Sequence, residues 1–150
     1  MKLSVRALHH VDLQEVLRIE QECFPSAWTS TEFQRFLAMD GVRAFVVAYR
    51  RLTCGFCVIE LESQRLRVLN LAVDPVFRRR GVALFLLGKI EALAKAQGRS
   101  RIELEVRETN LAAQLLYRKA GYRAVEILRE HYGNEDGYLM RRELPSSKAS

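Results

Sequence analysis

The sequence predicts a mixed α/β fold, and three observations lead to this fold class. With 150 residues, the chain has the size of one average domain. Hydrophobic residues make up 49% of it and charged residues 28%, which is typical of a protein with a packed core. Runs rich in β-branched and aromatic residues alternate with runs whose apolar residues recur at helical spacing. We therefore expect one domain over residues 1–144, followed by a loose tail over residues 145–150.

The expected elements follow in the order strand, two helices, three strands, helix, strand, helix and two strands. The β-branched and aromatic runs predict strands at residues 4–8, 42–49, 55–61, 66–73, 101–106, 122–128 and 138–142. The helical periodicity, with capping and stop residues, predicts helices at residues 12–24, 29–39, 81–97 and 110–120. Two capping boxes, Asp12 with Glu15 and Thr29 with Glu32, begin the first two helices, and Pro25 ends the first.

The connections between these elements predict how the strands pair. Short polar turns join strands 42–49, 55–61 and 66–73, so these three should form an antiparallel meander. The long helix at 81–97 separates strands 66–73 and 101–106, which implies a right-handed parallel crossover. The expected architecture is a mixed, mostly antiparallel sheet in a three-layer domain with helices on both faces.

The charge balance and the ends of the chain bound the possible partners and the compartment. Lys and Arg number 24 against 18 Asp and Glu, a formal charge of +6. This excess favours a nucleic acid, a ribosomal surface or a phosphorylated cofactor, although a plain basic surface is an equal interpretation. Every apolar run is far shorter than the ~20 residues of a membrane helix, and charge comes too early for a signal peptide. We expect a cytoplasmic protein that has no membrane partner.

Three cysteines, Cys23, Cys54 and Cys57, raise the question of redox or metal chemistry. Cys54 and Cys57 form a C-x-x-C pattern. A zinc site needs about four ligands, and no second cysteine pair or nearby histidine supplies the rest. A thioredoxin-type motif would open a helix, whereas this one lies at a predicted strand. We expect buried free thiols and no metal, and leave any role beyond packing open.

The segment 68–83 carries the strongest functional signal. A strand ends, a turn with Pro75 follows, and Arg78, Arg79 and Arg80 precede Gly81 at the start of a helix. The first turn of a helix presents free amides and binds anions, and a glycine lets phosphates approach the backbone. The pattern predicts a diphosphate site, with a solvated arginine run as the alternative. Neither the P-loop nor the dinucleotide-binding motif is present.

Four strings in order resemble one enzyme family. The string RRRGVA at 78–83 resembles the acetyl-coenzyme A signature of the GCN5-related N-acetyltransferases (GNAT). AVDP at 72–75, LEVRETN at 104–110 and LYRKAGY at 116–122 resemble further motifs of the family, especially its bacterial ribosomal-protein alanine N-terminal acetyltransferases. The resemblance spans residues 5–143. It implies a GNAT-like domain whose parallel strand pair splays around acetyl-CoA, the cosubstrate.

The resemblance also implies which residues contact acetyl-CoA. Backbone groups of Leu71, Ala72 and Val73 would pair with the pantetheine arm, and the amide near Val73 would polarise the thioester carbonyl. The pyrophosphate and outer phosphates would lie against Arg78, Arg79, Arg80, Gly81, Val82 and Ala83. Asn110 would contact the cofactor from the next helix, although a plain N-cap is an equal interpretation.

Two side chains fit the chemistry of amine acetylation. An amine must lose its proton before it attacks a thioester, and Glu105 at the end of a central strand is the expected base, directly or through water. Glu103 lies two residues earlier and shares its face, so a solvated polar face is the alternative for both. Tyr117 would lie beside the thioester sulfur and give a proton or a hydrogen bond to the leaving thiolate.

The chain departs from the family pattern where the acceptor would bind. The loop at 24–29 is two residues longer than the compact F-P-W-S of the relatives, and Trp28 in it is a predicted substrate contact. Residues 129–132 resemble R-x-x-Y-Y, with His131 in place of one tyrosine. Tyr132 is the second predicted substrate contact, with a merely buried aromatic as the alternative. The identity of the acceptor and the oligomeric state stay open.

The leading hypothesis is an acetyl-CoA-dependent N-acetyltransferase that acts on the N-terminal amine of a protein. An enzyme for a small-molecule amine or a lysine side chain is the nearest alternative. Lysine would be harder to deprotonate, because its amine has a higher pKa than an α-amino group. An RNA- or ribosome-binding module would need aromatic residues among the arginines, and only Phe77 is there, so no direct nucleic-acid partner is expected. A regulatory domain that senses CoA is disfavoured because Glu105 and Tyr117 are both present.

Overall fold

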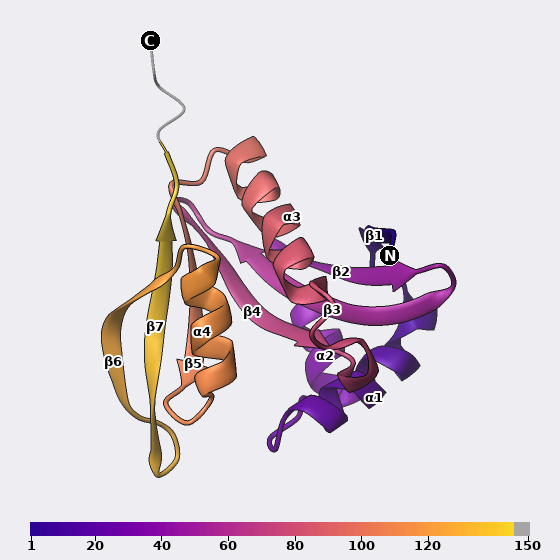
Figure 1. Cartoon of the computed structure of the whole chain (residues 1–150), viewed down its shortest axis with the longest axis horizontal. Helices are drawn as coiled ribbons and strands as arrows, with labels where there is room; N and C mark the ends of the chain where they lie inside the picture. The colour runs from indigo at the N-terminus through magenta and orange to yellow at the C-terminus, as the bar shows by residue number, and fades with distance from the viewer. Residues whose placement is uncertain (146–150) are drawn as a thin grey trace. The chain divides into compact units, whose positions relative to one another are not determined.

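The computed structural model describes residues 1–145, which form two compact units (Figure 1). The first unit comprises Met1–Glu60 and Asn70–Lys89, and the second comprises Leu61–Leu69 and Ile90–Ser150 as far as residue 145. Two strands, β3 (through Leu61 alone) and β4, and one helix, α3, contribute residues to both units. Apart from Pro145, the predicted tail lies outside the described residues.

The elements agree in kind and order with those predicted. The strands are β1 (Leu3–Ala7), β2 (Val42–Tyr49), β3 (Leu52–Leu61), β4 (Arg65–Val73), β5 (Arg101–Arg107), β6 (Arg123–Tyr132) and β7 (Glu135–Glu143). The helices are α1 (Leu13–Cys23), α2 (Ser30–Leu37), α3 (Val82–Ala96) and α4 (Leu111–Lys119), with short 3-10 turns η1 (His10–Asp12) and η2 (Pro75–Phe77). The largest differences in boundaries are in the β6–β7 hairpin, which is longer than predicted at both sides of its turn.

The strands follow one another in the sheet as β1-β2-β3-β4-β5-β7-β6. Strands β4 and β5 pair in parallel, Arg65–Val68 against Arg101–Leu104, as the long connection through α3 predicts. The β1–β2, β2–β3, β5–β7 and β6–β7 pairs are antiparallel. This mixed sheet confirms the predicted fold class.

The first unit packs its two N-terminal helices and its strands around an aromatic core. Val16 and Ile19 of α1 are fully buried, as are Phe33 of α2 and Phe56 of β3. The Phe33 and Phe56 rings meet edge to face at 5.7 Å between centroids. Strand β3 is buried from residue 54 to residue 59, which explains why it is a nearly continuous apolar run rather than an alternating one.

The C-x-x-C cysteines lie inside this core. Cys54 and Cys57 of β3 are both fully buried free thiols, and Cys23 is a half-buried free thiol. Burial raises the pKa of Cys57 to about 12, so its thiol keeps its proton at neutral pH and is a poor nucleophile. These two cysteines are the buried free thiols that the sequence predicts.

One of the two predicted capping boxes is wrong. Thr29 Oγ1 accepts from Glu32 N at 3.1 Å and Glu32 Oε1 accepts from Thr29 N at 3.0 Å, which confirms the second box. Asp12 instead accepts two hydrogen bonds from the Arg6 guanidinium, at 2.7 and 2.8 Å, and one from His9 N. A bidentate, charge-assisted pair is stronger than a neutral cap, so the carboxylate stays with Arg6 of β1.

In the second unit, alternate residues of β5 divide the sheet into an apolar and a charged face. Ile102, Leu104 and Val106 are buried, and Leu104 pairs with the equally buried Met140 of β7. Glu103 and Glu105 point to the opposite face, as the two-residue period requires. These two carboxylates therefore lie on the charged face of this unit.

Candidate active site

In the first unit, Asp74 organises the turn that leads into α3. Its carboxylate accepts from Val76 N at 3.1 Å and from Arg18 Nη2 at 2.7 Å, so the turn is tied to α1. Asp74 is buried. Burial alone would raise its pKa, but the hydrogen bonds from Arg18 and Val76 outweigh that effect and hold the pKa below its usual value. Arg18 is a partner that the sequence analysis missed, because 56 residues separate it from Asp74.

The arginine turn has the backbone and the charge of an anion site. Arg78, Arg79 and Arg80 are all exposed, and α3 begins at Val82 immediately after Gly81. Arg79 and Gly81 have φ values of +63° and +79°, in the left-handed region where glycine is favoured. A Cβ at Gly81 would meet nothing within 4 Å in the protein. Within the fold, glycine is therefore favoured at this position by its positive φ and not by a lack of space.

The end of β4 approaches its neighbour strand closely. A Cβ on Gly55 of β3 would lie 2.6 Å from the Ala72 carbonyl oxygen, so only glycine fits there. The thiol of Cys23 donates to the Val73 carbonyl oxygen at 3.3 Å, and Arg78 Nη2 donates to its sulfur at 3.4 Å. The Val73 carbonyl is thus already engaged, and the predicted role of the Val73 amide stays a prediction.

Trp28 is held in an aromatic cluster of the first unit. Its indole stacks on Phe36 at 4.4 Å and meets Phe33 edge to face at 5.0 Å. Its backbone N donates to Glu20 Oε2 at 2.9 Å, and Asn70 Nδ2 donates to Glu20 Oε1 at 2.8 Å. Glu20 is only 2% exposed, and burial raises the pKa of its carboxyl. Glu20 and Asn70 fix the loop of Trp28, although the sequence analysis singled out neither.

In the second unit, Glu103 and Glu105 occupy very different surroundings. Glu103 is 1% exposed and accepts from Arg65 Nη1 and Arg141 Nε, both at 2.6 Å. Burial raises the pKa of its carboxyl, but these two guanidiniums outweigh burial and the pKa lies below its usual value. The solvated-face interpretation is therefore wrong for Glu103, which is locked in a buried ion network.

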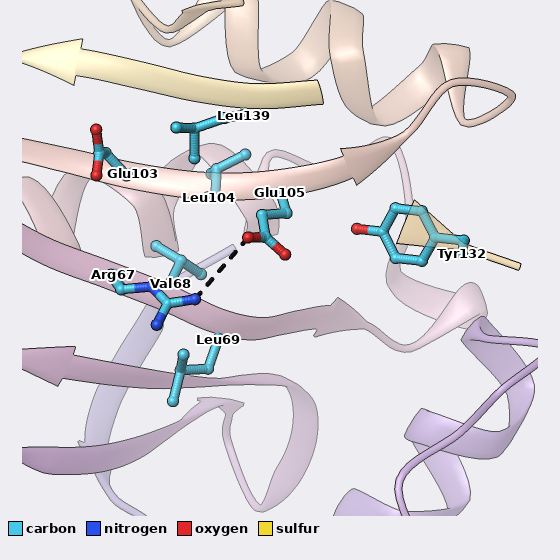
Figure 2. A pocket seen from close by; sticks show the side chains of 8 residues that line it. All are labelled: Arg67, Val68, Leu69, Glu103, Leu104, Glu105, Tyr132 and Leu139. Carbon is cyan, nitrogen blue, oxygen red and sulfur yellow. Dashed lines mark ion pairs between the residues drawn. The ribbon is translucent and has the colours of Figure 1, made fainter. Parts of the chain in front are cut away.

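Glu105 is accessible, and its carboxylate lines a cavity. The Glu105 side chain is 33% exposed, its Oε1 lies 2.6 Å from His131 Nε2, and its Oε2 lies 3.9 Å from Arg67 Nη2. Figure 2 shows the Tyr132 hydroxyl pointing toward this carboxylate. The cavity, of about 180 Å³, is lined by Arg67, Val68, Leu69, Glu103, Leu104, Glu105, Tyr132 and Leu139. Its lining combines apolar side chains with the accessible Glu105 carboxylate, the Arg67 guanidinium and the Tyr132 phenol.

A strand irregularity places His131 and Tyr132 beside Glu105. The β6–β7 register shifts between Leu128 and Tyr132, and Glu130 within this bulge has a φ of +51°. Glu130 N donates to Asp136 Oδ1 at 2.8 Å, which ties the bulge to β7. Neighbouring side chains of a regular strand point to opposite faces, whereas here the His131 and Tyr132 rings meet edge to face at 4.9 Å.

Tyr132 is clamped on two sides. The Arg107 guanidinium carbon lies 4.5 Å from the centre of its ring. A Cβ on Gly137 would lie 2.6 Å from Tyr132 Cε2, so the ring packs on a bare glycine of β7. Burial, with the negative charge of Glu105 as a second cause, raises the pKa of Tyr132 to about 12. The phenol therefore keeps its proton and can donate.

Tyr117 and Asn110 lie at the two ends of α4. Tyr117 is buried, and burial together with the nearby Tyr132 raises its pKa to about 12, so its hydroxyl is a proton donor rather than a base at neutral pH. Asn110 Oδ1 accepts from Ala113 N at 3.2 Å, which confirms its interpretation as an N-cap. Its predicted contact with a cofactor stays a prediction.

His131 is the candidate that the sequence analysis gave no role. The signal was present, because His131 stands where the resembling motif has a tyrosine. Its partner could not be read from the sequence, because His131 and Glu105 lie 26 residues apart and meet only through the bulge and the β5-β7-β6 pairing.

The comparison with protein families decides which enzyme class these groups belong to. The model of the acetyltransferase (GNAT) family matches residues 13–122. The chain belongs to this family. The predicted GNAT resemblance and the predicted N-acetyltransferase enzyme class are confirmed.

Individual GNAT proteins resemble the chain over almost its full length. The [ribosomal protein bS18]-alanine N-acetyltransferase of Salmonella typhimurium is 29% identical over 91% of this chain and 95% of that relative. The crystal structure of the corresponding Escherichia coli enzyme covers 99% of both chains with a TM-score of 0.88 at 24% identity. The structure of Arabidopsis thaliana NAA60 in complex with acetyl-CoA covers 95% of this chain and 100% of that one, with a TM-score of 0.84 at 20% identity.

Within residues 1–145, no helix is long and apolar enough to cross a membrane. The solved structures of Arabidopsis thaliana NAA60 and Naa50 hold acetyl-CoA or a bisubstrate analogue. The assignments of individual residues to cofactor, acceptor and proton transfer stay predictions.

Proposed function

We propose that this GNAT chain transfers the acetyl group of acetyl-CoA to the N-terminal α-amino group of a protein, in the cytoplasm and as a single catalytic domain over residues 1–144. The family match supports the reaction class. Relatives named as ribosomal-protein alanine N-acetyltransferases, with similar length and coverage, support a protein N-terminus as acceptor. The observation that carries the proposal is the accessible Glu105 carboxylate in an open cavity, while Glu103, two residues away, is fully paired.

The first unit supplies groups that fit the phosphates of acetyl-CoA. The exposed residues Arg78, Arg79 and Arg80 bring positive charge, and the amides of residues 81–84 precede the first helical hydrogen bond, from Phe85 N to Gly81 O at 2.9 Å. In this proposal Gly81, Val82 and Ala83 hold the pyrophosphate by their backbone. Leu71, Ala72 and Val73 hold the pantetheine arm, and the acetyl thioester supplies the group that is transferred.

The second unit supplies the groups that move protons. Glu105 takes a proton from the acceptor ammonium, directly or through water, and leaves the neutral amine as the nucleophile. Peptide α-amino groups titrate near ~7.7–8.0, so this demand on a carboxylate is modest at neutral pH. Tyr117 donates to the leaving thiolate, in agreement with a phenol whose pKa is raised to about 12 by burial.

Two aromatic residues are the proposed contacts of the acceptor peptide. Tyr132 lines the cavity beside Glu105, where its protonated hydroxyl can donate to a peptide carbonyl. Trp28 lies on the loop that Glu20 anchors in the first unit. We propose no membrane and no nucleic-acid partner for the reaction.

Acetyl transfer from labelled acetyl-CoA to a set of peptides tests this proposal. The set varies the first residue and includes matched peptides whose N-terminus is blocked but which keep an internal lysine, together with a polyamine. We expect label in the free N-terminal peptides and none in their blocked counterparts. Label confined to the blocked lysine peptides or to the polyamine would contradict an N-terminal acceptor while leaving the acetyltransferase class intact.

A further inference from the structure

We propose that His131 is the positioning residue of the Glu105 base, a role that rests on the proposed function. His131 Nε2 lies 2.6 Å from Glu105 Oε1, within hydrogen-bond distance. An ionised carboxylate can only accept, so the nitrogen that faces it carries the proton. The imidazole therefore donates to one oxygen of Glu105 and fixes the orientation of the carboxylate.

The surroundings of Glu105 leave its other oxygen for the acceptor. Oε2 faces Arg67 Nη2 across 3.9 Å, an ion-pair distance longer than a hydrogen bond (Figure 2). His131 of β6 thus holds one oxygen of the carboxylate by a hydrogen bond, and Arg67 of β4 attracts the other oxygen by its charge. In the reaction an N–H bond of the acceptor ammonium breaks, an O–H bond forms on Oε2, and this proton later leaves to solvent through the accessible side of the carboxyl group.

The fold supports the imidazole in this position. The His131 ring meets Tyr132 edge to face at 4.9 Å, and Tyr132 is itself packed between the Arg107 guanidinium and Gly137. The Arg107 guanidinium is fixed in turn by an ion pair with Glu135 at 3.2 Å. The bulge with Glu130 at positive φ turns both rings toward β5. These contacts hold the imidazole although its side chain is 38% exposed.

A donor role makes a specific prediction about which side chain can replace the imidazole. The terminal amide nitrogen of glutamine reaches about as far as Nε2 and also donates, whereas phenylalanine keeps a ring but cannot donate. We expect His131→Phe to lower kcat about tenfold without changing the KM for acetyl-CoA, as loss of one hydrogen bond to a charged group would. His131→Gln should recover most of this loss. His10→Phe, a matched change in the first unit, should leave kcat at the wild-type value.

Combination with Glu105→Gln tests whether His131 acts through Glu105. If it does, His131→Phe should cause no further loss of kcat in the Glu105→Gln background. A loss that multiplies in the double variant, a Gln variant as slow as the Phe variant, or an unchanged His131→Phe would each overturn the proposal. A wild-type protein that transfers no acetyl group to any peptide would instead contradict the proposed function.

Nitrogen-15 NMR of the free protein gives a readout that does not depend on activity. The chain has three histidines, so the His131 signals are assigned by their disappearance in His131→Phe. We expect a proton on His131 Nε2. A proton on Nδ1 instead would remove the donor and overturn the proposal, whatever the turnover of the variants.

Discussion

The arginine turn of the first unit and the Glu105 cavity of the second unit offer different kinds of chemical groups. At the turn, the features suited to an anion are backbone conformation and helix amides, supplemented by the guanidiniums of three exposed arginines. At the cavity, the candidate groups are side chains of β5 and β6, and Glu105 and Tyr132 are each held by a residue distant in sequence, His131 and Arg107 respectively. A site built on backbone is encoded in one local segment, whereas a site built on side chains needs the whole sheet.

This difference predicts different responses to substitution. Conservative changes of single functional groups should reduce turnover strongly at the Glu105 cavity and leave affinity intact. At the turn, changes of backbone preference should affect binding and stability together.

The largest effect is expected for Glu105→Gln. Removal of a general base costs about 10²–10⁴ in rate, so kcat should fall by that amount while the affinity for acetyl-CoA holds. Part of the loss should return as the pH rises past ~8, where the acceptor amine loses its proton unaided. Turnover measured from pH 6 to 10 checks this, and equal ratios of wild type to variant at all pH values would contradict it.

Glu103→Gln is the matched control for that experiment. Because Glu103 is buried with Arg65 and Arg141, this change should lower the free energy of unfolding by about 3 kcal/mol. The pKa of Glu103 is depressed, so its contribution to stability is present above the ordinary carboxyl pKa and is lost as the pH falls. If the two variants had similar effects on turnover and on melting temperature, they would contradict the proposal that Glu105 is the base and Glu103 a structural ion-pair partner.

The second largest effect is expected for Tyr117→Phe. The change removes only the phenolic oxygen, and that hydroxyl is protonated because burial raises its pKa to about 12. We expect kcat to fall about 10- to 100-fold with unchanged substrate binding, since the interaction is strongest in the transition state. An acetyl donor with a more acidic thiol should shrink the deficit. Weaker acetyl-CoA affinity with unchanged kcat would make Tyr117 a cofactor contact only.

The third prediction concerns Gly137, on which the Tyr132 ring of the cavity packs. In Gly137→Ala the new Cβ would lie 2.6 Å from Tyr132 Cε2 and 3.1 Å from the Val106 carbonyl oxygen, so the ring must move. Tyr132 packs against His131, so movement of its ring should weaken the hydrogen bond from His131 to Glu105. Loss of one hydrogen bond to a charged group corresponds to a fall in kcat of about tenfold, and we expect the acceptor KM to rise as well. Steady-state kinetics with a peptide acceptor give both values. Wild-type values would show that the ring clamp has no part in the reaction.

A smaller effect is expected from Gly81→Ala at the turn. The φ of +79° makes any Cβ unfavourable there although nothing lies within 4 Å, so the free energy of unfolding should fall by about 1–2 kcal/mol. Calorimetric titration should also show weaker binding of acetyl-CoA. Gly88→Ala is the control, because Gly88 lies inside α3 with equally open surroundings and alanine should stabilise the helix by ~0.5–1 kcal/mol.

The smallest effect is expected at Asn110. Asn110→Ala removes the N-cap of α4 and should cost about 1 kcal/mol of stability, seen as a lower melting temperature. Asn110→Ser keeps a capping oxygen and should restore most of it. If acetyl-CoA affinity falls in the Ala variant far beyond its loss of stability, Asn110 is a cofactor contact as well as a cap.

Much of the fold could be predicted from the sequence because local signals agreed with each other. The Thr29 and Glu32 box, the β-branched runs and the long crossover helix each indicate one conformation from neighbouring residues alone. The prediction failed at Asp12, where Arg6 from another strand outcompetes the local cap. It also missed the length of the β6–β7 hairpin, because the exposed and bulged end of β6 shows no alternation of apolar and polar residues.

The sequence by itself determined the family, the order of the elements and the arginine turn before α3, since all of these are written in contiguous residues. Only the tertiary structure decided that Glu103 is locked by two arginines while Glu105 remains accessible, although both lie on one face of one strand. It also decided that His131 faces Glu105. The physical reason is that burial and charge pairing depend on residues brought together by strand pairing, and a single strand bulge sets which side chains meet.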